Sequence, residues 1–130
     1  MKIKYVLTDV QELSFKKNLK EDIQLEIQTK SDYTVFYADD STSCMGVLSI
    51  DLVPLNNEEK LQIKYRSNSI FELKDIVLND EIKKELHMET YNRLFPLCCT
   101  HIKNFLTLIG LPDIKINPID FSQSVISVNN

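Results

Sequence analysis

The chain has 130 residues, of which 43% are apolar, and its 15 basic and 19 acidic residues give a formal net charge of -4. This apolar content is typical of a globular domain rather than a disordered chain, and a domain of this length builds a core without disulfides or metal. Basic and acidic residues are interspersed with no basic stripe, so we expect no nucleic-acid partner.

The first predicted element is a β-strand near the N-terminus. Ile3, Tyr5 and Leu7 recur with the period of two that places side chains on one face of a strand. Leu13 and Phe15 follow with the same spacing. We therefore expect Ile3, Tyr5 and Leu7 to share one face of the sheet.

The second predicted strand begins at Ile23. Ile23, Leu25 and Ile27 alternate with polar residues, a pattern typical of a half-buried strand. The strand is expected to continue through residues 33–37, which are rich in aromatic and β-branched side chains. Asp and Ser residues at 38–41 then predict a turn, because their side chains bond locally to the backbone.

Two further strands complete the predicted sheet. Residues 48–52 alternate, and Pro54 ends that strand because proline donates no hydrogen bond to the ladder. Residues 61–66 alternate in turn, the polar run 67–69 predicts a bulge, and residues 70–73 resume the strand. Short connections favour antiparallel pairing between consecutive strands.

The hydrophobic period changes near residue 80, where a helical region begins. Asn79 or Asp80 is a suitable N-cap. Pro96 predicts a break, so we expect a short helix followed by a longer one that starts at this proline. Gly110 is placed to end the long helix, and residues 114–121 are expected to be extended. The sequence thus predicts an α+β fold, with four antiparallel strands followed by a long helix in the C-terminal half.

Cysteine usage and the N-terminal sequence predict a cellular location. Cys44, Cys98 and Cys99 are odd in number and two are adjacent, which does not suit a paired disulfide framework. Residues 1–5 contain lysines where a signal peptide would have its apolar stretch. No run approaches the ~18 apolar residues of a membrane helix. We expect a cytoplasmic protein with reduced thiols and no membrane insertion.

No arrangement of residues predicts catalysis, a cofactor or a metal. His87 and His101 have no partner at a spacing that predicts nucleophilic or acid–base chemistry. The Cys98, Cys99 and His101 run lacks the pair spacing and the fourth ligand of a structural zinc site, and buried cysteines on a helix are the simpler interpretation. Asp39 beside Asp40 fits a solvated turn. We expect a protein that is not an enzyme.

Several segments, in order and spacing, resemble the SecB-type protein-export chaperones. Leu-Phe-Pro at 94–96 precedes a helix, and Gly-Leu-Pro at 110–112 is followed by Ile-Asn-Pro-Ile-Asp-Phe at 116–121. The family has a Leu-Phe-Pro triplet at the start of its long helix and a similar Pro-to-Phe segment after it. Upstream, the segments at 13–15, 23–27 and 70–73 also match in order.

The resemblance implies a fold, an assembly and a function. It implies one SecB-like domain over residues 1–130, assembled as a homodimer or homotetramer through helix and sheet-edge contacts. It also implies ATP-independent holding of unfolded polypeptide in apolar grooves. The positions that match Ile23, Leu25 and Ile27 help line such a groove in the family, so these three are the candidate client-binding residues. The alternative is that they are core residues, as alternating Ile and Leu commonly are.

Three departures from the family pattern keep a second function open. Phe15 is joined to Ile23 by only seven residues, 16–22, where the family has a long crossover loop. The family binds the export ATPase through acidic residues, whereas two of the matching positions here are Lys16 and Lys64. The chain also continues only nine residues past 121. The alternative function is therefore a dedicated protein-interaction subunit, such as the chaperone of a toxin–antitoxin system, without a general export role.

Overall fold

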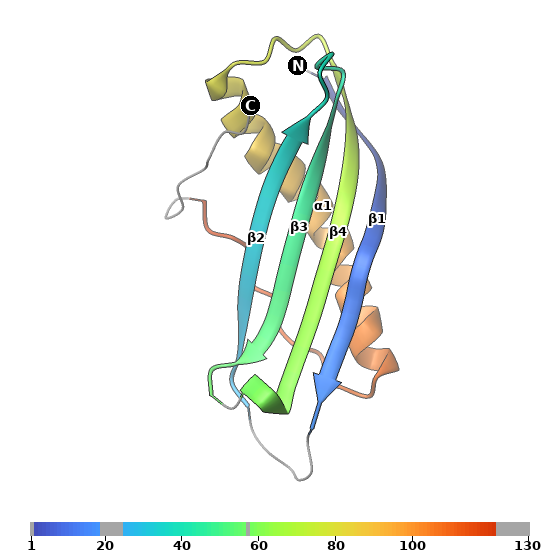
Figure 1. Cartoon of the computed structure of the whole chain (residues 1–130), viewed down its shortest axis with the longest axis vertical. Helices are drawn as coiled ribbons and strands as arrows, with labels where there is room; N and C mark the ends of the chain where they lie inside the picture. The colour runs from blue at the N-terminus through green and yellow to red at the C-terminus, as the bar shows by residue number, and fades with distance from the viewer. Residues whose placement is uncertain (1, 19–24, 57, 122–130) are drawn as a thin grey trace.

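A four-stranded sheet with one long helix on one face makes up the protein (Figure 1). The computed structural model describes residues 2–18, 25–56 and 58–121. In chain order the elements are β1 (Lys2–Lys17), β2 (Ile27–Tyr37), β3 (Ser43–Pro54), the 3-10 helix η1 (Glu58–Lys60), β4 (Leu61–Lys74) and α1 (Asp80–Leu108). The predicted α+β class, four antiparallel strands followed by a long helix, is confirmed.

The strand order in the sheet is β1-β4-β3-β2, with every neighbouring pair antiparallel. Consecutive strands are neighbours from β2 to β4, as expected, but β1 pairs with β4 and not with β2. The connection between β1 and β2, residues 18–26, is longer than the seven-residue link predicted from the sequence. Its nine residues can span roughly 30 Å, whereas β1 and β2 lie only roughly 14 Å apart across the sheet. The connection is therefore long enough to join the two edges of the sheet.

Strand β1 changes face part-way along its length. Ile3 packs on the core, and the Tyr5 ring contacts Phe71 with centroids 5.7 Å apart. A register shift between Tyr5 and Leu7 then places Leu7 opposite Ile70, on the other face of the sheet. The expectation that Leu7 shares a face with Ile3 and Tyr5 is wrong, because the extra residue of a bulge reverses the alternation.

The bulge predicted in β4 at residues 67–69 is also wrong. Ser67 and Ser69 keep the alternation and are buried on the helix-covered face. Each finds a polar partner there: Ser69 bonds Thr8 at 2.8 Å, and Ser67 contacts the Cys98 sulfur at 3.6 Å. Because both buried hydroxyls have hydrogen-bond partners, β4 keeps a regular alternation through these residues. The register shifts between the two strands come from extra residues in β1.

Strand β2 begins later than the sequence pattern predicts. It starts at Ile27, whose partner in β3 is Pro54, the last residue of that strand. Pro54 ends β3 as predicted, and among the described residues one further backbone bond joins the two segments, from Leu55 N to Glu26 O at 2.8 Å. Leu25 therefore precedes the strand, and Ile23 lies outside the described residues.

Helix α1 is continuous, not the two helices predicted from Pro96. Asn79 caps it as expected, since its Oδ1 accepts a hydrogen bond from Ile82 N at 2.8 Å. Pro96 lies inside the helix and removes one donor, which leaves the carbonyl of Asn92 without its usual partner. Asn92 is exposed, so water can serve that carbonyl. Gly110, with a φ of 77°, follows the end of the helix as predicted.

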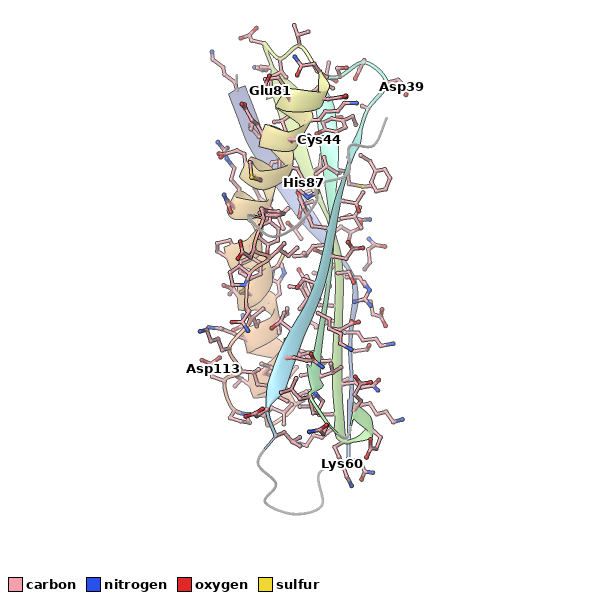
Figure 2. The ribbon with its side chains drawn as sticks, turned by 90° about the vertical axis from the view of Figure 1, so that its left-hand side faces the viewer. Asp39, Cys44, Lys60, Glu81, His87 and Asp113 are labelled. Atoms are coloured by element: carbon pink, nitrogen blue, oxygen red, sulfur yellow. The ribbon has the colours of Figure 1, made fainter. Side chains whose placement is uncertain are left out.

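The core lies between α1 and the inner face of the sheet. Its largest fully buried side chains include Leu48, Ile50, Leu52, Ile63, Tyr65, Phe71, Leu86, Tyr91, Leu94, Ile102 and Leu106. Seen from the side, the helix covers one face of the sheet and leaves the side chains of the other face projecting outward (Figure 2). Among the elements described, none covers this outer face.

Candidate functional site

An open apolar pocket of about 460 Å³ lies where β2 and β4 begin. Its apolar lining consists of Leu25, Ile27, Leu61, Leu111, Pro112 and Ile114. Its polar lining consists of Asp113, Lys115 and Asn117. The pocket therefore combines Leu25 and Ile27, two of the client-binding residues predicted from the sequence, with Leu61 of β4 and the segment after α1.

The chain reversal at Gly110 builds the pocket. Its positive φ, together with a hydrogen bond from Leu111 N to Leu106 O at 2.9 Å, ends α1 and turns the chain back toward β2. Leu111 and Ile114 then come to face Leu25 and Ile27. All four side chains are partly buried, so they contact the core and still leave apolar surface at the pocket.

The segment that follows, residues 111–121, lies between α1 and β2. Residues 111–120 form neither helix nor strand, and residue 121 lies in a turn. The extended conformation was predicted for residues 114–121 of this segment. Ile116 is buried, Asn117 N donates to Thr29 Oγ1 at 3.1 Å, and Ile119 N donates to Tyr91 Oη at 2.9 Å. Within the described residues, the segment is held to β2 and to the middle of α1 by apolar packing and side-chain acceptors.

Aromatic rings anchor the end of this segment. Phe121 packs edge-on against His87 and Tyr91, with centroids 5.5 and 5.1 Å away, and both of these rings contact Tyr33. Burial raises the pKa of Tyr91 to about 12. Burial also lowers the pKa of His87, an effect that nearby Asp32 opposes. The cluster is therefore uncharged near neutral pH.

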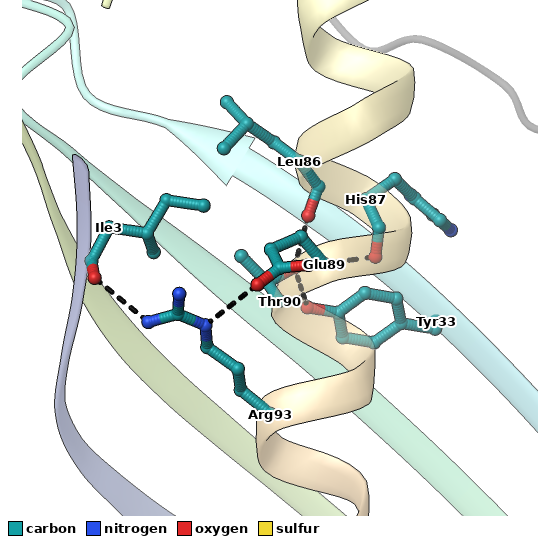
Figure 3. A network of polar contacts seen from close by, with 7 residues as sticks. All are labelled: Ile3, Tyr33, Leu86, His87, Glu89, Thr90 and Arg93. Carbon is teal, nitrogen blue, oxygen red and sulfur yellow. Dashed lines mark hydrogen bonds and ion pairs between the residues drawn. The ribbon is translucent and has the colours of Figure 1, made fainter. Parts of the chain in front are cut away.

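Polar contacts beside this cluster connect β2, α1 and β1 (Figure 3). Thr90 Oγ1 donates to Leu86 O at 2.6 Å, so it accepts from Tyr33 Oη, also at 2.6 Å. On the other side of the helix, Arg93 donates to Ile3 O at 2.8 Å. The same guanidinium pairs with a helix carboxylate, Glu89, at 3.0 Å. These contacts hold the N-terminal half of α1 between the two edge strands.

Strand β1 is an edge strand with several exposed apolar side chains. At one end Arg93 donates a hydrogen bond to Ile3 O, and at the other end Lys17 Nζ donates to Ile109 O at 3.1 Å. Between these ends, large apolar side chains are exposed at Tyr5, Val6, Leu7, Val10 and Phe15. A long apolar edge strand is a surface suited to pairing with another chain.

The residues considered for catalysis or metal binding have structural contacts instead. His101 Nδ1 lies 3.0 Å from Tyr65 Oη, and burial raises the pKa of the Cys98 thiol. Asp40 lies in the predicted turn and accepts hydrogen bonds from the backbone and hydroxyl of Thr42, which lower the pKa of its carboxyl. In the described ranges, no three His, Cys, Asp or Glu residues are grouped to hold a metal ion.

Within the same described ranges, no helix is long and apolar enough to span a membrane.

Comparison with solved structures identifies the fold. No protein-family model and no curated protein matches the sequence. The Mycobacterium tuberculosis Rv1957 SecB-like chaperone, solved in complex with a ChAD peptide from the Rv1956 HigA1 antitoxin, superposes with a TM-score of 0.69. The match covers 91% of this chain and 88% of that chain at 11% sequence identity. The protein has a SecB-like fold. This finding agrees with the resemblance drawn from the ordered sequence segments.

The SecB-like sheet separates the residues that sequence reasoning selected. Leu25 and Ile27 lie together at the pocket, whereas Lys16 and Lys64 lie on the outer face, where Lys64 is opposite Ser14 of β1. Sequence reasoning missed the contribution of the segment after α1 to the pocket. The available signal was the Gly-Leu-Pro triplet at 110–112, which predicted the helix end but not the chain reversal toward β2.

Proposed function

We propose that this protein is an ATP-independent chaperone that holds unfolded or partly folded polypeptide, and that the pocket at Leu25 and Ile27 takes apolar side chains of the client. The observation that carries the proposal is an open apolar pocket of about 460 Å³ within a SecB-like fold. Its volume falls within the range of pockets that bind small organic groups, so it has room for about two or three client side chains.

The pocket also offers polar groups for a client backbone. Asn117 and Lys115 line it beside the apolar residues, and the edge strand β2 starts at Ile27, inside the pocket. An extended peptide that inserts apolar side chains can therefore find backbone partners on the same edge, as in strand addition. This arrangement favours an extended client segment over a folded surface.

A dedicated client is favoured over a general export role. Lys16 and Lys64 replace acidic residues through which the family binds the export ATPase, and a reversed charge disfavours that encounter. The Rv1957 chaperone with the same fold was solved with a peptide from an antitoxin. By analogy, the client of this protein would be one partner such as an antitoxin.

We also propose that the protein is a homodimer or homotetramer in the cytoplasm and that β1 takes part in the assembly. The support is the apolar side chains of Tyr5, Val6, Val10 and Phe15 exposed along this edge, because edge strands of this length are usually covered, charged or paired. Chromatography with light scattering measures the mass, and a monomer at micromolar concentration would contradict this part of the proposal.

The pocket is tested by an aggregation assay. A chemically unfolded model client is diluted into increasing protein, with Leu25→Ser/Ile27→Ser as the test variant and Val77→Ser as the matched control. Val77 is 84% exposed and lies away from the pocket. We expect wild type and control to suppress aggregation equally and the pocket variant to need at least about tenfold more protein.

Two checks make the result decisive. Circular dichroism and urea unfolding establish that the pocket variant is folded under the assay conditions. Equal suppression by the folded pocket variant and the wild type would show that clients bind elsewhere. If the wild type fails to suppress aggregation of generic clients but binds a single antitoxin-type peptide through Leu25 and Ile27, the dedicated function is the correct one.

A further inference from the structure

The outer face of the sheet contains a row of four apolar side chains, one from each strand. Leu7 of β1 is opposite Ile70 of β4, Ile70 is opposite Met45 of β3, and Met45 is opposite Phe36 of β2. Leu7 is 48% exposed and Phe36 is 49% exposed, while the two central side chains are partly buried. We call these four residues the outer row.

The outer row is not part of the core. Helix α1 lies on the opposite face of the sheet, as Figures 1 and 2 show from two directions. An antiparallel sheet with one solvated face normally places polar residues on that face. Further along, this sheet does so, with Glu12 opposite Arg66, Arg66 opposite Ser49 and Ser49 opposite Asp32. An unbroken apolar row in such a setting marks a surface for a partner.

The charges beside the outer row differ between its two sides. On one side Asp9 lies in the next row, opposite Asn68, and Asp32 lies one row beyond. Neither carboxylate forms an ion pair with any described residue. On the other side Lys4 is opposite Glu72, and one row beyond them Lys2 is opposite Lys74, so that side is basic. The row of Asp32 also contains Glu12 and Arg66, and Arg66 is paired with Asp51 at 2.9 Å. The side with Asp9, Glu12 and Asp32 is therefore acidic and complements a basic partner.

The dimensions of the outer row select the shape of that partner. Across four strands the row is roughly 14 Å long. An α-helix with apolar residues at i, i+4, i+7 and i+11 presents a stripe of about 16 Å. The exposed area of the four side chains is on the order of 300 Å² at most, whereas a stable dimer buries about 800 Å² on each subunit. The area suits a short helix better than a second copy of the chain.

We propose that the outer row binds a short amphipathic helix of another protein, with lysine or arginine along the flank that faces Asp9 and Asp32. This site is separate from the pocket at Leu25 and Ile27, which is formed by the opposite ends of β2 and β4. It is also distinct from Lys16 and Lys64, which lie further along the outer face.

The probe is a synthetic 16-residue helical peptide with four leucines in one stripe and lysines along one flank. A second peptide carries glutamates in place of the lysines. Fluorescence anisotropy with the full chain should give at least tenfold tighter binding of the lysine peptide. Leu7→Ser/Phe36→Ser should weaken that binding at least tenfold, Asp9→Asn/Asp32→Asn should remove most of the preference for lysine, and Val77→Ser should change neither.

The same variants separate this proposal from its rivals. If Leu7→Ser/Phe36→Ser is folded by circular dichroism and binds the lysine peptide as wild type does, the proposal is overturned. It is also overturned if that variant lowers the oligomer mass, because the row would then contact a second copy, or if only Leu25→Ser/Ile27→Ser abolishes peptide binding. Suppression of client aggregation is expected to be unchanged by the outer-row substitutions, so failure of one proposal is distinguishable from failure of the other.

Discussion

Gly46 in β3 lies against the Tyr33 ring, and its replacement by alanine tests how tightly β2, β3 and α1 are packed. A Cβ atom at this position would come within 2.9 Å of Tyr33 Cε1 and Cζ, and closer still to Tyr33 Oη. Real carbon atoms do not approach so closely, and Tyr33 is buried. Gly46→Ala must therefore displace the tyrosine from its place beside Thr90.

The expected loss of stability follows from these contacts. Overpacking a buried site costs about 1–3 kcal/mol. Displacement of Tyr33 Oη from Thr90 Oγ1 loses a buried hydrogen bond worth about 1 kcal/mol, although Thr90 keeps its bond to Leu86 O. Removal of a glycine from a strand returns about 0.5–1 kcal/mol. Gly46→Ala should therefore destabilise the protein by about 2 kcal/mol.

Urea unfolding at fixed protein concentration measures this loss, since the stability of any oligomer depends on concentration. With a slope of about 2 kcal/mol per molar urea, the midpoint should fall by about 1 M. Tyr33→Phe removes the atom nearest the added methyl, so Gly46→Ala/Tyr33→Phe should cost less than the two single variants added together, by at least about 0.5 kcal/mol. Strict additivity of the two substitutions would refute the steric reasoning.

Three further predictions concern α1. Asn79→Ala removes the N-cap bond to Ile82 and should cost about 1 kcal/mol in the unfolding free energy, whereas Asn92→Ala on the exposed helix surface should cost nothing measurable. Pro96→Ala restores a helix donor at an exposed position and should stabilise the protein by about 1–3 kcal/mol; a lower urea midpoint would contradict this. Burial lowers the pKa of His87 in the folded state, so below about pH 6.5 the unfolded state binds more protons than the folded state. The free energy of unfolding should therefore decrease as the pH is lowered through this range. His87→Gln should lose less stability than wild type between pH 7 and 5, and parallel curves for the two proteins would contradict the assignment.

Local sequence signals predicted most of the fold. The period of two in residues 48–52 and 61–66 correctly gave β3 and β4, because each strand buries one face under α1. Capping by Asn79 and termination at Gly110 were predicted from side-chain and backbone chemistry that acts within a few residues. Such features require no knowledge of distant segments.

The errors arose where a distant segment decides the conformation. Leu7 faces outward because β1 has a bulge between Tyr5 and Leu7 where it pairs with β4. The alternation of residues within β1 gives no information about this pairing. Pro96 stays within one helix because packing on the sheet outweighs the single missing hydrogen bond. The pocket needed Leu61 and Leu111, more than forty residues apart in sequence, to meet the predicted residue Ile27.

The placement of α1 explains how one small sheet can present two independent apolar surfaces. The helix buries one face, and the segment after it lines the pocket with Ile27 at the start of β2. Phe36 of the outer row lies near the other end of the same strand and points to the opposite face. Phe36 lies nine positions after Ile27 along the strand, a distance of roughly 30 Å, so neither ligand would touch the other. Substitutions at the two surfaces should therefore act additively, and a client held at the pocket would leave the outer row free to bind a helix from a third protein.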